Sequence, residues 1–331
     1  MVMTHDARAL RLLSRVHHTR EAVGLELLSR RVGKRRSVYR WLQRLRKHVT
    51  YYPRIAFGGF GLVHVHLFIR DAGSEWFSYP YAIERVWTID RPGQHTLYLH
   101  CLLPIEHLHL VPQGEGITSI TTSDGWQDLA PLEEALDDAG RPVPREATAS
   151  PIPQVSITTA WRDQPFVLPV ACELLRAPAN MDDLWHAIQQ RLGAEVWEYF
   201  RRYTRRWPHN GKFYVRHAFD HLNRYGLVLQ HVVRYEPLHE HTIELFLLTD
   251  NTQELRDHLV GLCPTMDAYP STDTYLLRVR GDHALIKRII TSPSIRHWWF
   301  VDHERTAHAQ PVRFAYEILF DPSTKMWRVP S

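Results

Sequence analysis

The sequence predicts an α+β protein in which a helical head followed by a sheet domain occurs twice. Three observations support this prediction. Apolar residues recur with a helical period up to residue 48, they alternate with a period of two after it, and a similar pattern returns about 178 residues later. With 331 residues, of which 44% are hydrophobic and 23% charged, the chain is long enough to form several domains.

Three helices are predicted before residue 49. From His5 to His17 the apolar residues follow helical spacing, and Thr19 suits the cap of a second helix that ends near Gly33. A third helix is expected from Arg35 to His48, with a buried stripe at Val38, Leu42 and Leu45. Thr50 to Ile55 follows as a wing or linker strand. We therefore assign residues 1–57 to a winged helix-turn-helix domain.

Residues 58–130 are predicted to form a sheet domain. Apolar residues alternate with His64, His66 and Phe68 in the first strand, which indicates that both of its faces are at least partly covered. A short helix is expected from Ser74 to Ala82. Two further strands are expected at Ile83 to Ile89 and at His95 to Leu103.

Residues 131–158 are predicted to be an exposed linker, because they contain acids and five prolines. A second, divergent helix-turn-helix-like domain is assigned to residues 159–236, and a second sheet domain to residues 237–331. Val215, Phe219 and Leu222 repeat the stripe of the third helix, and Leu245-Phe246-Leu247 repeats Leu67-Phe68-Ile69 at nearly the same offset. This near-constant offset indicates an internal duplication.

In the second copy a helix is expected from Glu195 to Arg206, inside an insertion that the first copy lacks. Its sheet domain is predicted to contain helices from Thr252 to Leu262 and from Asp282 to Thr291. Three strands are predicted, at Thr274 to Arg280, at His297 to His303 and at Val312 to Phe320.

Positive charge is concentrated at one end of the chain. Residues 1–50 contain thirteen Lys or Arg against three acids, a net charge of +10, so the rest of the chain carries −6 of the total +4. This distribution is typical of a segment that binds a polyanion, most often nucleic acid. Because the Arg-rich face coincides with the third helix, we expect double-stranded DNA to be its partner.

In a helix-turn-helix domain the last helix lies in the major groove, and its N-terminal side chains meet the base edges. Arginine binds guanine and glutamine binds adenine through paired hydrogen bonds. The residues expected to contact bases are Arg35, Arg36, Ser37, Tyr39, Arg40 and Gln43. The residues expected to contact phosphates are Arg30, Arg31, Lys34, Arg44, Arg46 and Lys47.

The corresponding helix of the second copy is a candidate for a second DNA contact. The residues expected on its exposed face include Lys212, Tyr214, Arg216, His217 and Arg224. Trp197 to Tyr235 holds eight Lys or Arg against two acids, yet this face is less basic than the first. The alternative is a degenerate copy whose helices support dimerisation. We therefore expect the two heads to bind DNA unequally.

The order of these elements resembles that of the Lrp/AsnC family of transcription regulators. The resemblance rests on the helix-turn-helix, the linking strand near Tyr51 to Ile55, and the strand Gly61 to Ile69 that opens the sheet domain. It implies ferredoxin-like βαββαβ sheet domains, DNA binding as a homo-dimer or higher homo-oligomer paired through these domains, and a small-molecule effector. Because this chain carries the unit twice, an intramolecular pseudo-dimer is also expected.

An enzyme is the contrasting hypothesis, since sirohaem decarboxylases resemble paired or fused units of this kind. Those enzymes carry a His-Asn-Tyr-type segment, which the nearest counterpart here, Ser294 to Phe300, lacks. The sequence also has no Walker loop, dinucleotide fingerprint, GxSxG or HExxH element. We therefore expect no catalytic residue and no cofactor. An abundant nucleoid-organising protein is the alternative to a local regulator.

Two histidine clusters are candidates for metal sites, namely His100, Glu106, His107 and His109, and His239, Glu240 and His241. Neither supplies further ligands at a recognised spacing, so we expect surface or strand histidines and no metal. Cys101, Cys172 and Cys263 are expected in the core. Apolar runs fall short of the roughly 20 residues of a membrane span, and no secretory signal is evident. We expect a cytoplasmic, nucleoid-associated protein with no membrane partner.

Overall fold

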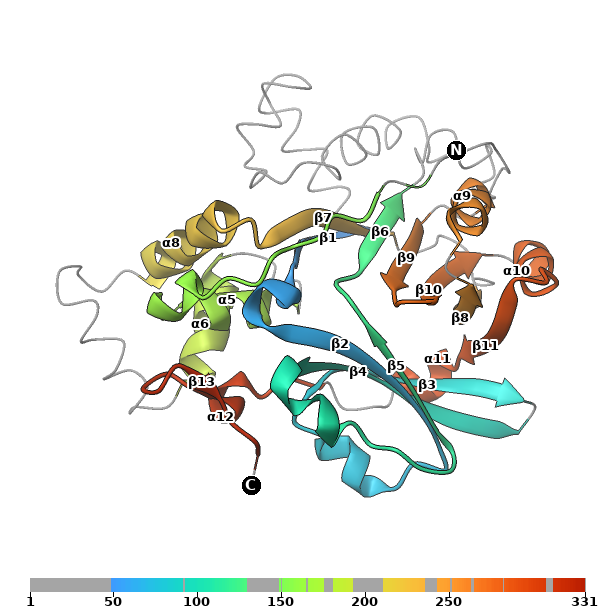
Figure 1. The fold of residues 1–331 in the computed structure, drawn as a ribbon, viewed down its shortest axis with the longest axis horizontal. Coiled ribbons are helices and arrows are strands. Elements are labelled where there is room, and N and C mark those ends of the chain that lie inside the picture. The colour runs from blue at the N-terminus through green and yellow to red at the C-terminus, as the bar shows by residue number, and fades with distance from the viewer. Residues whose placement is uncertain are drawn as a thin grey trace, which may run out of the picture.

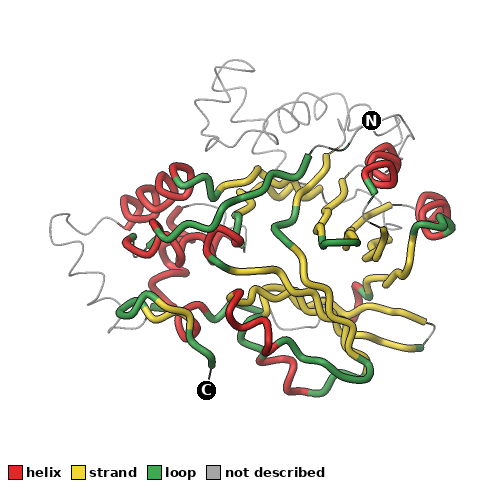
Figure 2. The backbone as a smooth tube through the Cα atoms, in the orientation of Figure 1, coloured by secondary structure: helices red, strands yellow, loops and turns green. Residues whose placement is uncertain are grey.

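A computed structural model describes residues 49–91, 93–129, 149, 151–164, 166–175, 181–192, 211–235, 243–250, 252–262, 265–281, 283–307 and 312–330. The helices predicted before residue 49 and the helix predicted from Glu195 to Arg206 lie outside these ranges. The described part is an α+β fold built around a large antiparallel sheet, as the class prediction requires (Figures 1 and 2). No described helix is long and apolar enough to cross a membrane.

The strands are β1 (Val49–Ile55), β2 (Leu62–Arg70), β3 (Ala82–Arg91), β4 (Gln94–Pro104), β5 (Ile117–Thr122), β6 (Trp126–Leu129), β7 (Val228–Tyr235), β8 (Ile243–Asp250), β9 (Thr265–Pro270), β10 (Thr274–Gly281), β11 (Ile295–Val301), β12 (Phe320–Asp321) and β13 (Met326–Trp327). The α-helices are α5 (Val167–Leu174), α6 (Met181–Arg191), α8 (Gly211–Arg224), α9 (Gln253–Leu262), α10 (His283–Ile290), α11 (His303–Ala307) and α12 (Tyr316–Leu319). Short 3-10 helices lie at Phe57–Phe60, Ser74–Ser78, Ile105–Leu110 and Ala160–Asp163.

Nine strands form the main sheet, in the order β5-β2-β4-β3-β11-β8-β10-β9-β6. It contains two groups of four consecutive strands, β2 to β5 and β8 to β11. In each group the fourth strand lies beside the first, the first beside the third, and the third beside the second. The groups join where β11 pairs with β3, at Phe300 opposite Ile89 and Val301 opposite Thr88.

The sheet curls until its two ends approach each other. β5 and β6 stand at opposite ends of the strand order, yet Thr122 and Trp126 are only four positions apart, a span of at most about 14 Å. The Ser123 amide donates to the Pro270 carbonyl at 3.0 Å, which ties the β5 end to β9. We call strands β2 to β5 and β8 to β11 the open barrel; Figure 1 shows β5 running on into β6.

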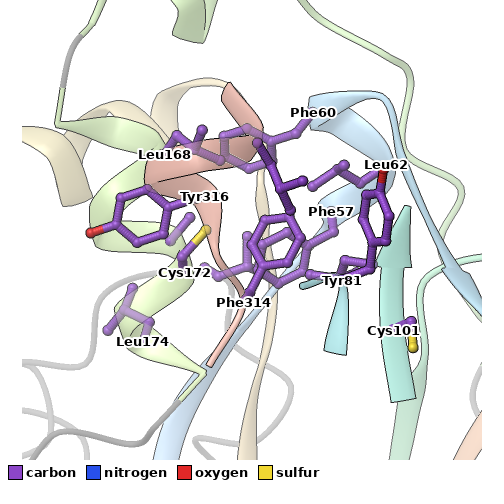
Figure 3. Close-up of a cluster of buried hydrophobic side chains, with 14 of the residues drawn as sticks. Phe57, Phe60, Leu62, Tyr81, Cys101, Leu168, Cys172, Leu174, Phe314 and Tyr316 are labelled. Atoms are coloured by element: carbon purple, nitrogen blue, oxygen red, sulfur yellow. The ribbon is translucent and has the colours of Figure 1, made fainter. Parts of the chain in front are cut away.

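The outer faces of the two strand groups are covered differently. Helices α9 and α10 cover the second group, where Leu259 and Ile286 are buried against Leu247 and Leu277. On the first group, side chains of α5, α8 and the C-terminal segment share one core with β2 and β4. Figure 3 shows part of this core, in which Phe57, Leu168, Cys172, Phe314 and Tyr316 come from distant parts of the chain. Cys101 and Cys172 are buried, as expected.

Strand β1, which confirms the strand expected after residue 49, pairs antiparallel with β7 in a separate two-stranded ladder. Pro53 lies opposite His231 in this ladder, and the two positions are separated by the same offset as Leu67 and Leu245. When two equivalent strands pair about a two-fold axis, the central residue lies opposite its own equivalent. We call the paired strands β1 and β7 the linker ladder. Its register therefore agrees with the offset of the sequence repeat.

The buried amide of Gln230, from β7, joins the linker ladder to β6. Its Oε1 accepts a hydrogen bond from the Gln127 amide at 2.5 Å, and its Nε2 donates to the Gln127 carbonyl at 3.0 Å. We expect Gln230→Ala to lower the free energy of unfolding by about 1–3 kcal/mol, because both buried backbone groups lose this partner. Urea denaturation measures the change. Gln113→Ala, at an exposed loop position, is the control, and equal effects would contradict the expectation.

Most elements predicted in the sheet regions are confirmed, including strands β3, β4 and β10 and helices α9 and α10. The helix expected from Ser74 to Ala82 is wrong, because only a 3-10 helix forms at Ser74–Ser78. Pro80 disfavours the helical conformation for the residue before it and lacks an amide to donate. Strands β5, β6, β7 and β9 were not predicted; β6 is only four residues long.

The strand expected from Val312 to Phe320 is also wrong. Its middle forms the short helix α12, and only Phe320 enters a strand. The apolar alternation suggested one buried face, but Ile318 is 55% exposed and Leu319 is buried instead. Tertiary contacts decide this outcome, because the Ala315 amide donates to the Pro80 carbonyl and the segment packs into the core shared with α5.

Within the predicted linker, residues 151–158 have no regular secondary structure. Their side chains are not all exposed, since Val155 packs against buried residues of the core and Ala149 is itself buried. The Thr158 amide donates to the Gly59 carbonyl at 3.0 Å. Val155 and Thr158 hold this segment against the first strand group, whereas Ala149 packs in the core of the second.

Candidate functional site

The interior of the open barrel contains a buried group of polar side chains on the first strand group. Alternation along β2 sends Val65 and Leu67 to the outer core, so His64 and His66 face the interior. His100 lies opposite His66 in the register of β2 and β4. We call His64, His66 and His100 the histidine cluster; they are 6%, 0% and 5% exposed.

Hydrogen bonds link the histidine cluster into a chain that ends on a carboxylate. His64 Nδ1 lies 2.7 Å from His100 Nε2, and His64 Nε2 lies 3.1 Å from Asp124 Oδ1. The Gly58 amide donates to both Asp124 oxygens at 3.1 Å, which fixes the carboxylate. His66 contacts the Tyr98 hydroxyl at 2.9 Å and the Thr122 hydroxyl at 3.1 Å. Asp124, His64 and His100 therefore form a connected proton path.

One ring of the second strand group closes over the histidine cluster. The Tyr269 ring, from β9, lies 4.8 Å from the ring centre of His66 and 5.3 Å from that of His100. The His66 and His100 rings are themselves stacked at 4.4 Å. A side chain at Gly125 would collide with Tyr269, since an added Cβ would overlap the atoms of its ring. The glycine thus allows the chain after β5 to pass closely over this ring.

Burial keeps the side chains of His66, His100 and Tyr269 in their neutral forms. Desolvation is the main cause that lowers the pKa of His66, and the nearby His64 lowers it further. Desolvation also lowers the pKa of His100, with further contributions from the other two histidines and from Arg54 and Arg278. Burial raises the pKa of Tyr269 in the same way. At neutral pH His66 and His100 are therefore uncharged.

The same positions of the second strand group carry an ion network instead. The repeat aligns β2 with β8 and β4 with β10, which places Glu244 at the position of His66, Arg278 at that of Tyr98 and Arg280 at that of His100. Arg278 contacts Glu244, and its Nη1 lies 2.8 Å from Glu84 Oε1 of β3. Desolvation raises the pKa of Glu244, but Arg278 and Arg280 outweigh it and lower this pKa to about 2.

Large apolar side chains fill the interior between these polar groups. The Phe68 ring stacks on Trp299 of β11 at 3.7 Å, and Tyr98 lies 4.2 Å from Phe246 of β8. In the sheet β2 is not a neighbour of β11, and β4 is not a neighbour of β8, so these contacts cross the barrel. We call Phe68, Tyr98, Phe246 and Trp299 the interior aromatic cluster. It joins the two strand groups through their concave faces.

Sequence reasoning missed the histidine cluster, although the alternation in β2 contained a signal. His64, His66 and Phe68 share one strand face, and Phe68 indicates that this face is covered. The pairing with His100 depends on the register of β4, which the sequence does not state. His107 and His109, which were expected to be surface or strand histidines, lie in a 3-10 helix where His107 is buried and His109 exposed.

Among the described residues, no group of three or more His, Cys, Asp or Glu side chains is arranged to hold a metal ion. The two nitrogens that meet between His64 and His100 lie too close together for an ion between them. The chemistry that the histidine cluster supports is proton exchange along its hydrogen bonds. His239, Glu240 and His241 lie outside the described residues.

The residues predicted to bind DNA in the first head, Arg30 to Lys47, lie outside the described residues. The candidates of the second head lie on α8. Arg216, His217 and Arg224 are exposed, whereas Tyr214 is half-buried and its ring stacks on Phe166 at 5.0 Å. Lys212 lies in the first turn of this helix. The buried stripe of α8 is formed by Val215, Ala218 and Leu222, with Phe219 partly buried against the same core.

Comparisons with protein-family models, with curated proteins and with solved structures found no match to this chain.

Proposed function

We propose that this protein is a double-stranded DNA-binding transcription regulator in which residues 1–48 supply the main DNA contact. The observation that carries the proposal is the net charge of +10 on residues 1–50 of a chain whose remainder is acidic. DNA affinity is dominated by such cations, because their binding to phosphates releases condensed counterions. The periodicity of the third predicted helix supports placing Arg36 and Arg40 at base edges.

The arrangement of the described residues supports a pseudo-dimeric architecture for this regulator. A βαββαβ chain with ferredoxin-like topology has the strand order found in both groups, fourth, first, third and second. In the second group α9 and α10 occupy the two helix positions, whereas 3-10 helices replace them in the first. Since the two groups already pair within one chain, each molecule presents two heads without a second subunit.

The linker ladder supports a defined relation between the two heads. β1 follows directly on the first predicted head, and β7 follows directly on α8 of the second. Their pairing brings together the two chain segments to which the proposed heads connect. The exposed Arg216 and Arg224 of α8 make the second head a DNA contact as well. It is the weaker of the two contacts, because its sequence is less basic than that of the first head.

We expect Arg36→Ala/Arg40→Ala to weaken duplex binding by more than tenfold, at ~1–3 kcal/mol per good base contact. Electrophoretic mobility shift measures the effect, with Arg288→Ala, an exposed arginine on α10, as the matched control. Affinity should also fall steeply with added salt. Unchanged binding by the double variant, or a flat salt dependence, would rule out the proposal.

A local regulator and a nucleoid-organising protein predict different occupancy of the genome. We favour regulation at discrete sites, because the predicted recognition helix offers Arg, Ser, Tyr and Gln side chains to base edges as well as cations to phosphates. Mapping of the bound sites should then give separate sharp peaks. A continuous coat along the chromosome would instead assign the nucleoid function.

A further inference from the structure

The histidine cluster lies directly beside the strand that leads out of the barrel. Arg54, in β1, pairs with Asp267 of β9 at 2.5 Å, and its guanidinium lies 5.8 Å from the centre of the Tyr269 ring. The same Tyr269 ring packs against His66 and His100. One ring therefore contacts both a permanent cation on β1 and two buried neutral imidazoles. We propose that the histidine cluster is a proton-operated latch, which loosens β1 from the open barrel on mild acidification.

The hydrogen bonds of the histidine cluster do not favour the addition of a proton. An ionised Asp124 only accepts, so the proton on the His64 Nε2 side points to it, and His64 Nδ1 then accepts from His100 Nε2. This arrangement of His64 and His100 is complete without an added proton. A proton added at His66 or His100 places a charge against a stacked ring 4.4 Å away, inside a site shielded from water.

Apart from Asp124, which contacts His64, the acids around the histidine cluster are already paired with arginines. The titratable or charged side chains that interact with it are Arg54 from β1, Tyr98 from β4, Asp124 after β5, Tyr269 from β9 and Arg278 from β10. Behind them lie Glu84 from β3, Glu244 from β8 and Asp267 from β9, which interact with Tyr98, Tyr269, Arg54 or Arg278. Asp267 pairs with Arg54, while Glu84 and Glu244 pair with Arg278. A proton added to the histidine cluster therefore brings a positive charge near Arg54 and Arg278. The carboxylates beside these arginines are already paired with them.

Arg54 is the cation that can move away at the least cost. Arg278 belongs to β10, which is paired on both sides inside the sheet. β1 belongs to the two-stranded linker ladder, which contacts the rest of the fold through the Arg54–Asp267 pair, through Gln230 and through the buried side chains of Ile55, Val228 and Leu229. Displacement of β1 lets water reach the protonated rings. If the proposed function holds, the same displacement shifts the basic segment, but the latch itself does not depend on DNA binding.

The direction of the pH effect follows from the lowered pKa values of His66 and His100. The docked state binds fewer protons than the open state, so docking is stable above the ordinary histidine pKa of about 6.5 and weakens as the pH falls below it. Between pH ~7.5 and ~5.5 each histidine shifts the equilibrium about tenfold toward opening, and both together about 100-fold. Glu244, with a pKa of about 2, stays ionised over this window.

Hydrogen exchange at pH 7.5 and 5.5, corrected for intrinsic exchange rates, tests the latch on the full chain. We expect protection of residues 49–56 to fall at least tenfold at the lower pH, while that of α10 stays unchanged. His66→Gln/His100→Gln should abolish the difference, and the exposed pair His258→Gln/His283→Gln should preserve it. Equal loss throughout the chain, no loss in β1, or a loss that persists in His66→Gln/His100→Gln would overturn the proposal.

If the double variant does not fold, the pH titration of the histidine ring resonances of the wild-type chain tests the latch instead. The latch requires His66 and His100 to titrate with the same midpoint as the amide signals of β1. A β1 signal that stays constant through the titration of both rings would overturn it.

Discussion

Arg256→Met is expected to destabilise the protein by about 3–5 kcal/mol, because removing one partner of a buried ion pair leaves the other charge buried and uncompensated. Arg256 on α9 is 1% exposed, and Asp128 on β6 is 4% exposed. The guanidinium donates to the two carboxylate oxygens from Nε and Nη2, both at 2.9 Å. In the variant, Asp128 loses a paired, charged donor inside the protein. Urea denaturation at neutral pH measures the loss.

The double variant Asp128→Leu/Arg256→Met is the matched control for this effect. Removing both charges also removes the penalty of burying them, so the double variant is expected to be much closer to the wild type than Arg256→Met. If the two variants lose the same stability, the cost comes from lost packing of the long side chain and the ion-pair explanation is wrong. The pair joins β6, which continues from the first strand group, to a helix of the second.

Phe68→Ala is expected to lower the free energy of unfolding by about 3–5 kcal/mol, because it empties a well-packed aromatic site. Phe68 is 2% exposed and stacks on Trp299 at 3.7 Å, with Phe246 5.8 Å away. Two of its ring partners thus belong to the second strand group. Chemical denaturation followed by both tryptophan fluorescence and circular dichroism measures the loss and shows whether one transition remains.

Phe77→Ala provides the control for Phe68→Ala, because Phe77 is 47% exposed on the same strand group. Its removal should cost no more than about 1 kcal/mol, as its ring contacts Trp87 only at the edge. Comparable losses for the two variants would contradict the view that the interior aromatic cluster couples the strand groups. A separation of the fluorescence and circular dichroism transitions in Phe68→Ala would support it.

Local pattern was sufficient for elements whose burial is one-sided and continuous. Helix α8 has the predicted stripe, with Val215 and Leu222 buried and Arg216 exposed, because a helix on a sheet domain must bury one face. Strands β3, β4 and β10 were likewise predicted from alternation. The pattern failed from Val312 to Phe320, where the apolar residues satisfy a neighbouring core and do not extend a sheet.

The sequence alone determined the α+β class, the near-constant offset of the internal duplication and the concentration of positive charge in residues 1–50. These properties depend on residue type and spacing, which the chain states directly. The tertiary structure decided that His64, His66 and His100 meet beside Tyr269, and that Arg54 lies close to the same ring. Strand register and sheet curvature create those contacts, and both depend on pairing between segments that lie far apart in the sequence.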